Sequence, residues 1–351
     1  MHAVFSRSAV AVATLALAGS ALAFSAPAAQ AAPVFTDAET HLDPYSGGYA
    51  YDLAGDDCDY TVTGGDEPDV PVVENGPAAS FTTTASTTFT SSTQAGDTAT
   101  GTASASGTGK VTSAAGSVST IDLSVTSSAQ LTNALGTSAN CNRQAYAGGE
   151  LEFQFTVAQP GFLQLTTKNT GNVYGQVYLE RLVTSGDDDS YVSFYGNGVK
   201  FNATTKVFLP AGTYAGSFEG EAYRASTSSS SVSGTTTVHG EFHVAGSQTA
   251  AVSGKGKKYV TLPSARSCAT HVAALEVTDK KKRAAKVKQV KVFVNDAKAK
   301  KVRTPDKGDV INVAIADDVT ADVRAEVTLF PAKKGKKAKS YTVSASYEAC
   351  S

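Results

Sequence analysis

The 351-residue chain contains no tryptophan, and threonine, serine, glycine and valine are prominent in its composition. This composition favours strands and turns and argues against a mainly helical protein. About 320 residues remain if an N-terminal leader is removed, which is enough for two ordinary domains with separate cores.

The small net charge of −2 conceals two oppositely charged halves. Residues 1–250 contain 22 Asp and Glu against 8 Lys and Arg, a net charge of −14. Residues 251–351 contain 10 Asp and Glu against 22 Lys and Arg, a net charge of +12. Each half can attract partners of opposite sign, including the other half, and the same charges also favour solubility.

The first 31 residues have the pattern of a signal peptide. Arg7 supplies a positive charge, residues 8–23 are uncharged and rich in Ala, Val and Leu, and small residues stand at Ala29 and Ala31. A cleavage site after Ala31 fits this pattern, with a cut after Ala23 as the alternative. The uncharged stretch is too short and too rich in Ala and Ser for a membrane span. We therefore expect a secreted, extracellular protein without a membrane anchor.

Export makes disulfides permissible, and the chain has four cysteines, Cys58, Cys141, Cys268 and Cys350. Four cysteines allow three connectivities. We predict the pairs Cys58–Cys141 and Cys268–Cys350, because each joins cysteines of one apparent domain; unpaired buried thiols are the alternative. Each bond closes a loop of about 80 residues, for which chain entropy alone would contribute at most ~4.5 kcal/mol.

Residues 32–245 are predicted to form a first β-sandwich domain. The segment 79–132 is rich in Ser and Thr, but apolar residues recur in it, and Ile121, Leu123 and Val125 alternate with polar residues. This alternation is typical of half-buried strands that expose threonine on one face. An O-glycosylated linker is the alternative reading of the segment.

The clearest strands of this domain are expected at 151–157 and 173–183. The second of these places four polar residues on one face, Tyr174, Gln176, Tyr178 and Glu180. The LPAGTY stretch at 209–214 resembles the turn into a late strand of bacterial jelly-roll modules, including those appended to secreted peptidases. The resemblance implies a jelly-roll-like ancillary sandwich without catalysis.

The stretch from Gly246 to Lys258 loses the large apolar residues of the preceding strands and gains Gly, Ser and Lys, which predicts a linker at 246–257. Residues 258–351 are then a second domain. The alternation of polar and apolar residues predicts seven strands in it, at 259–262, 271–277, 286–294, near 301–303, 310–315, 322–329 and 340–347. Seven short strands in about 95 residues favour an immunoglobulin-like sandwich.

Three segments carry a resemblance: VTLPSARSC at 260–268, VFVN at 292–295, and SY at 340–341 followed by Cys350. Together they resemble the C-terminal module of many secreted actinobacterial proteins. That resemblance implies an Ig-like sandwich tied by a disulfide between its first and last strands, and an extracellular location. The chain departs from the family pattern at Asn295-Asp296, where Asn-Gly is usual, and this puts the type of hairpin turn in question.

Candidate metal ligands are few. His239, Glu241 and His243 alternate on one predicted strand face, where they suit Zn²⁺ or are simply exposed polar residues, and we favour the second reading. Two acidic runs, one at 56–59 and one at 187–189, have oxygen ligands for Ca²⁺ but lack the spacing of a known calcium loop. Motifs for a nucleophile, a metalloprotease or a phosphate loop are absent from the sequence. We therefore predict no catalytic residues, no metal and no cofactor.

The most informative charged residues are two basic clusters of the second domain. They lie between the second and third and between the sixth and seventh predicted strands, which places both at one end of an Ig-like sandwich. We name them the basic pole: Lys280, Lys281, Lys282, Arg283, Lys333, Lys334, Lys336 and Lys337. Lys307, between the fourth and fifth strands, belongs to the same end.

These observations favour a secreted, non-catalytic binding or structural protein of the cell surface. The basic pole is expected to bind an anionic polymer of the cell envelope; nucleic acid is disfavoured because aromatic residues are not interleaved with the lysines. The alternatives are a solubilising role for the lysines, and a secreted hydrolase that uses paired carboxylates of the first domain.

Overall fold

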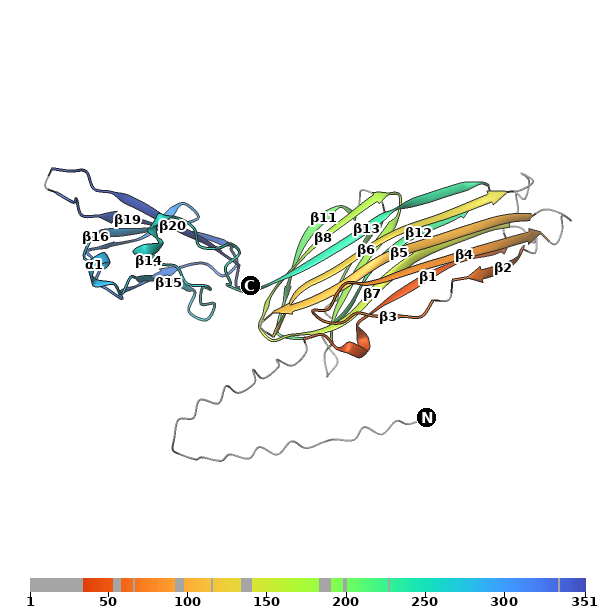
Figure 1. Cartoon of the computed structure of the whole chain (residues 1–351), viewed down its shortest axis with the longest axis horizontal. Coiled ribbons are helices and arrows are strands. Elements are labelled where there is room, and N and C mark those ends of the chain that lie inside the picture. Colours follow the sequence, from red (N-terminus) through yellow and green to blue (C-terminus); the bar gives the residue numbers. More distant parts are fainter. Residues whose placement is uncertain are drawn as a thin grey trace, which may run out of the picture. The chain divides into compact units, whose positions relative to one another are not determined.

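Antiparallel strands form most of the described residues in this computed structural model, which confirms the prediction of an all-β protein (Figure 1). The structure describes residues 34–52, 58–65, 67–91, 98–114, 116–133, 141–182, 191–197, 201–226, 228–333 and 335–351. The predicted signal peptide, 1–31, lies outside these residues. The named helices are short, at Asp37–Glu39 (η1), Lys255–Lys258 (η3) and Lys281–Ala284 (α1). Over the described ranges, no helix has the length and apolar character needed to cross a bilayer.

Two sheets pack against each other in the first sandwich. Sheet A has six strands in the order β10-β9-β12-β7-β1-β3, and sheet B has seven in the order β11-β8-β13-β6-β5-β4-β2. The bounds are β1 His41–Asp52, β2 Cys58–Gly64, β3 Val70–Pro71, β4 Ala79–Ser91, β5 Thr98–Ala114, β6 Ser117–Asn133, β7 Cys141–Val157, β8 Gly161–Gly171, β9 Tyr174–Leu182, β10 Tyr191–Asn197, β11 Ala203–Leu209, β12 Gly212–Ser226 and β13 Ser230–Val244.

The Ser- and Thr-rich segment is the centre of sheet B. Along β4, buried and exposed residues alternate without interruption, and Phe81, Ala85 and Phe89 are on the buried face. On the outer face of the sheet, hydroxyl groups pair across strands, for example Ser104 with Ser128 at 2.9 Å. The prediction of half-buried strands is therefore confirmed, and the alternative of an O-glycosylated linker is wrong.

Large apolar side chains fill the space between the two sheets. Phe153, Phe155 and Phe218 come from sheet A and are almost completely buried, and Ile121 and Leu163 meet them from sheet B. The rings of Phe153 and Phe218 pack edge to face with centroids 4.9 Å apart. Burying each such side chain contributes about 2 kcal/mol, so this layer is the main source of stability of the first sandwich.

Strand β1 is an element that the sequence analysis did not predict. It contains Pro44, Gly47 and Gly48, which usually interrupt strands. Pro44 is tolerated because the strand pairs fully with β7 but only briefly with β3, through His41 and Leu42. Glycine at position 47 leaves room for the Tyr146 ring, since a Cβ there would lie 2.7 Å from the Tyr146 hydroxyl.

The second sandwich contains all seven predicted strands. One sheet has the order β14-β15-β18 and the other β17-β16-β19-β20. The bounds are β14 Val260–Thr261, β15 Val272–Val277, β16 Val287–Val294, β17 Ala297–Arg303, β18 Val310–Ala314, β19 Ala321–Leu329 and β20 Ser340–Tyr347. Val290, Val323 and Leu275 are among the residues of a core that both sheets share. The likenesses to jelly-roll and Ig-like modules stay predictions.

The turn between β16 and β17 adopts the geometry expected of Asn-Gly although its second residue is aspartate. Val294 pairs with Ala297, and both central residues have positive φ, 47° for Asn295 and 63° for Asp296. Positive φ at both positions defines a type I′ hairpin turn. The side chain of Asn295 supports it by accepting a hydrogen bond from the Asp322 N–H at 2.8 Å.

A disulfide joins Cys268 to Cys350, which confirms that predicted pair, with the Cα atoms 5.4 Å apart. Cys58 is also disulfide-bonded. The side chain of Cys141 lies outside the described part of the structure, so the pair Cys58–Cys141 stays a prediction.

Arg266, two residues before Cys268, is almost completely buried at the same end of the second sandwich. Its guanidinium donates to the carbonyl oxygens of Ala316, Asp317, Val319 and Glu348 at 2.7–3.1 Å. Charge-assisted bonds of this kind are among the stronger ones in proteins, and here they tie the β18–β19 connection to the last residues of the chain.

The predicted linker, 246–257, is hydrogen-bonded to the second sandwich. Ser253 pairs with Ser344 of β20 through both backbone bonds, and Gln248 pairs with Tyr347. Small residues fit closely here, since a Cβ on Gly254 would lie 2.3 Å from the carbonyl oxygen of Thr342. Residues Pro33–Ser351 form one compact unit, and the division into two domains stays a prediction.

A fragment comparison tests that division. We expect residues 246–351 to fold alone with a cooperative melt, and residues 258–351 to be less stable by ~3 kcal/mol, because the shorter fragment loses several backbone hydrogen bonds to β20. Urea denaturation followed by circular dichroism measures both values. A molten 246–351 fragment would show that its core depends on the first sandwich.

Candidate functional site

The two clusters of the basic pole meet at one end of the second sandwich, as predicted. The first cluster leads into β16 and the second follows β19, and these strands pair with Val287 opposite Leu329. The N–H of Phe330 donates to the carbonyl of Lys286 at 2.9 Å, which joins the two connections directly. The lysines of both clusters therefore lie close enough to act on one ligand.

The short helix α1 explains how the first cluster is presented. Ala284 is buried in the core of the sandwich, whereas Lys281, Lys282 and Arg283 are exposed. In the second cluster Lys333, Lys336 and Lys337 are exposed, and Lys334 lies outside the described residues. None of the described side chains of the basic pole takes part in an ion pair within the chain. Their charge is therefore available to a partner.

Two further segments bring cations to this end. The connection between β17 and β18 carries Lys307 and is held there by a bond from the Thr304 N–H to the Lys288 carbonyl at 2.9 Å. Helix η3 also lies here, because the N–H of Thr278 donates to the Tyr259 carbonyl. The Lys258 ammonium sits 5.3 Å from the ring centre of Tyr259 and 5.1 Å from that of Tyr341. Acids also lie at this end, among them Asp279, Asp306 and Asp309.

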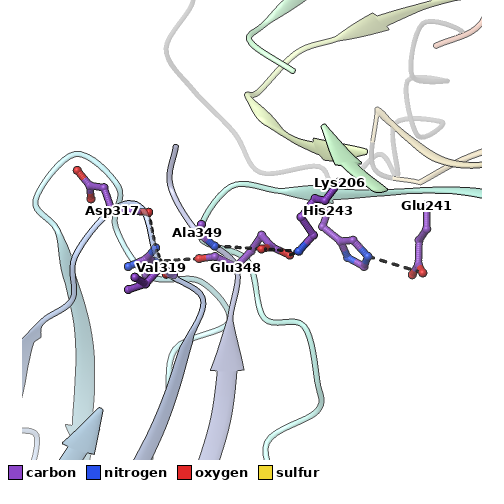
Figure 2. A network of polar contacts seen from close by, with 8 residues as sticks. Lys206, Glu241, His243, Asp317, Val319, Glu348 and Ala349 are labelled. Atoms are coloured by element: carbon purple, nitrogen blue, oxygen red, sulfur yellow. Dashed lines mark hydrogen bonds and ion pairs between the residues drawn. The ribbon is translucent and has the colours of Figure 1, made fainter. Parts of the chain in front are cut away.

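A polar network lies at the opposite end of β20, around Glu348 (Figure 2). The side chain of Glu348 is only 2% exposed, and both its oxygens accept from the Lys206 ammonium at 2.9 Å. Lys206 belongs to β11, so this ion pair links the first sandwich to the C-terminal residues. A buried carboxylate needs a partner of opposite charge. We therefore interpret this ion pair as part of the fold and not as a binding site.

The histidines considered as zinc ligands interact with separate carboxylates. Nδ1 of His239 lies 2.5 Å from Asp122, and Nε2 of His243 lies 3.6 Å from Glu241 (Figure 2). In the part of the chain that the structure describes, no group of three metal-ligating side chains comes together. Of the acidic runs, 187–189 and residues 56–57 lie outside the described residues.

A second charged surface occupies the outer face of sheet A, the face opposite the phenylalanine core. Strand register aligns its side chains in rows: Asp43, Glu150 and Glu219 lie opposite one another on β1, β7 and β12. We name this surface the acidic tyrosine face: His41, Asp43, Tyr45, Asp69, Tyr146, Glu150, Glu152, Tyr174, Gln176, Tyr178, Glu180, Glu219, Glu221 and Tyr223. Like charges directly opposite on a sheet destabilise it, and such costly clusters are found preferentially at functional sites.

Tyr45 lies at the centre of this face. Its ring covers Gly148, where a Cβ would lie 2.5 Å from the tyrosine hydroxyl. The hydroxyl donates to Oε1 of Glu219 at 2.5 Å. Burial, and then the charges of Glu219 and Glu221, raise the pKa of Tyr45 far above its usual value, so this proton stays in place.

Burial makes three carboxyl groups of the face, those of Asp43, Glu150 and Glu221, harder to ionise. Burial, followed by the charge of Glu219, raises the pKa of Glu221 from 4.5 to about 7. Burial also raises the pKa of Glu150, although a hydrogen bond with Ser217 opposes the effect. His41 belongs to the same face, and its Nε2 lies 3.5 Å from Glu152 and 3.8 Å from Asp69.

Beside Glu221 the face is hollowed. The hollow measures about 260 Å³ and is lined by Asn172, Tyr174, Glu221 and Tyr223. It combines two aromatic rings with a carboxylate and an amide. That combination suits a ligand with a cationic or hydrogen-bond-donating head on an apolar stem.

The sequence analysis identified the polar residues of β9 on one face but not the acidic tyrosine face as a whole. Glu219, Glu221 and Tyr223 alternate in the same way on β12, and this alternation was the available signal. Only the register between strands shows that these residues of β12 lie beside Glu150 and Tyr45. Tyr45 in particular could not be placed from the sequence, because strand β1 was not predicted.

No protein-family model matches the chain, and comparison with characterised proteins and with solved structures found no similar chain.

The raised pKa of Glu221 predicts a pH-dependent stability. Between pH 4.5 and about 7 the folded state binds more protons than the unfolded state, so stability falls as pH rises through this window and is level above it. Glu221→Gln removes the effect. We expect it to raise the free energy of unfolding by about 1–2 kcal/mol at pH 8, after allowance for solvent screening, and to change little below pH 4.5.

Urea denaturation across this pH range measures the difference between the two proteins. The control is Glu276→Gln, which changes an exposed acid of the second sandwich. An equal gain for both variants at pH 8 would contradict the assignment to Glu221.

Proposed function

We propose that the protein is a secreted, non-catalytic binding protein that holds an anionic polymer of the cell envelope on its basic pole. One observation supports this proposal above all. Exposed lysines from separate connections gather at one end of the second sandwich, and their charges are not neutralised within the described chain. Lysines on exposed loops act as mobile point charges, which suits a polymer of repeated anionic groups better than a single shaped ligand.

Secretion belongs to the same proposal. The signal-like N-terminus predicts export, and the Cys268–Cys350 disulfide is compatible with an oxidising compartment. The resemblance of the second domain to C-terminal modules of secreted actinobacterial proteins is part of the proposal, as is the absence of a catalytic role.

Charge reversal tests the basic pole. The variant Lys281→Glu, Lys282→Glu, Lys336→Glu should bind cell-wall fractions or a model polyanion at least about tenfold more weakly at low salt, because exposed charges act through screened attraction. Binding of the parent should also weaken steeply between low and physiological salt. Titration of immobilised polymer, with thermal melting of each protein, gives both results.

The matched control reverses three exposed lysines away from the pole: Lys168→Glu, Lys298→Glu, Lys301→Glu. It makes the same change of net charge and should retain most of the binding. Equal losses in both variants would show that the pole acts only through the net charge of the protein, which contradicts a specific binding surface. Unchanged binding in the pole variant would refute the proposal.

A second candidate function, a secreted hydrolase, is favoured by a specific observation on the acidic tyrosine face. Glu219 and Glu221 lie two residues apart on one face of β12, and the pKa of Glu221 is raised to about 7. A proton-holding acid beside a second carboxylate is the arrangement that glycoside hydrolysis uses. Release of reducing ends from envelope polysaccharide, abolished by Glu221→Gln and unaffected by the pole variant, would establish this function instead.

A further inference from the structure

We infer that the acidic tyrosine face is a docking surface for the basic pole of a second copy of this chain, so that copies associate head to tail. The inference rests on the proposed function in one respect, since it uses the same basic pole. It adds a second surface, the outer face of sheet A, and names its partner.

Charge complementarity is the first argument. The residues of the first sandwich belong to the half of the chain with net charge −14, and those of the second sandwich to the half with +12. Within the described chain, no ion pair joins the acidic tyrosine face to the basic pole. The acids of one surface and the lysines of the other can therefore meet in a contact between two copies, and such matching speeds association and sets orientation.

The hollow beside Glu221 is the second argument, because its chemistry fits a lysine. Tyr174 and Tyr223 supply ring faces, and Glu221 and Asn172 supply oxygens for an ammonium group. The same chain already holds a lysine between tyrosines, with Lys258 close to the rings of Tyr259 and Tyr341. The lysines of the basic pole stand on exposed connections and have the apolar stems that such a hollow accommodates.

An unpartnered buried group strengthens the case. Gln144 lies on β7 with the parity of Tyr146 and Glu150, and it is only 4% exposed, yet its Oε1 has no hydrogen-bond partner. A buried acceptor without a donor is costly, and a donor from outside the chain relieves that cost. The Gln144 side chain has to shift to accept such a bond, because its oxygen has almost no exposed surface.

The two surfaces differ, so the contact between copies is heterologous. A dimer formed by such a contact leaves one surface of each kind unoccupied. Further copies can therefore add, which gives a ring or an open filament. The expected assembly is concentration-dependent and favoured at low salt, because exposed charges drive it.

Charge-swapped variants of the full chain test this arrangement. One is the pole variant used above, Lys281→Glu, Lys282→Glu, Lys336→Glu. The other is a face variant, Asp69→Lys, Glu152→Lys, Glu221→Lys. Sedimentation velocity at roughly 20 mM and roughly 150 mM salt measures association of each protein alone and of an equimolar mixture.

We expect the parent to associate at low salt and each variant alone to associate at least about tenfold more weakly, because its two surfaces then carry the same sign. The mixture should recover association, since each variant carries the surface that complements the other. Thermal melts confirm folding, and Glu221→Gln, which leaves the remaining acids of the face in place, should weaken parental association in the same direction. A parent that stays monomeric at low salt, or a mixture that fails to associate, would overturn the inference.

The same proteins separate this inference from the proposed function. The face variant should bind a model polyanion at least as tightly as the parent does, because its basic pole is intact and its face has gained lysines. Failure of the parent to bind polyanions, together with association of the mixture, would refute the proposed function alone. Polyanion binding without association of the mixture would refute the inference alone.

Discussion

Each long strand of this protein must present every second side chain to the space between two sheets, and the rest of the structure depends on that constraint. It selects Phe153, Phe155 and Phe218 for the interior of the first sandwich and leaves the alternate positions to water. Because the same rule applies to adjacent strands in register, side chains on the outer faces form rows. Sheet B thereby carries ladders of hydroxyl groups, and sheet A carries ladders of carboxylates and tyrosines.

The carboxylate rows make the outer face of sheet A electrostatically unfavourable. Asp43, Glu150 and Glu219 face one another across three strands, and burial adds to their mutual repulsion. Tyr45 relieves part of it by donating a hydrogen bond to Glu219. The second sandwich has the opposite arrangement, with cations collected at one end and few acids among them. A chain that separates its charges in this way is suited to interactions between unlike surfaces.

The second sandwich is secured at both of its ends. At one end the guanidinium of Arg266 binds four carbonyl oxygens beside the Cys268–Cys350 disulfide. At the other, the lysine-bearing connections are anchored by backbone hydrogen bonds and by the buried Ala284, so that their charged side chains stay exposed on a defined base. The basic pole thus combines flexible charged side chains with a backbone that is held in place.

The all-β class, the seven strands of the second sandwich, the Cys268–Cys350 pair and the gathering of the lysine clusters at one end could all be predicted from the sequence. Each follows from local alternation, from residue spacing or from the direction of successive strands, and these features are present in the linear sequence. Tertiary structure alone decided the role of β1, because Pro44 and Gly47 look like strand breakers until a neighbouring strand and the Tyr146 ring explain them. It also decided the acidic tyrosine face. Tyr45, Glu150 and Glu221 are far apart in sequence, and only the register of hydrogen bonds between β1, β7 and β12 brings them side by side.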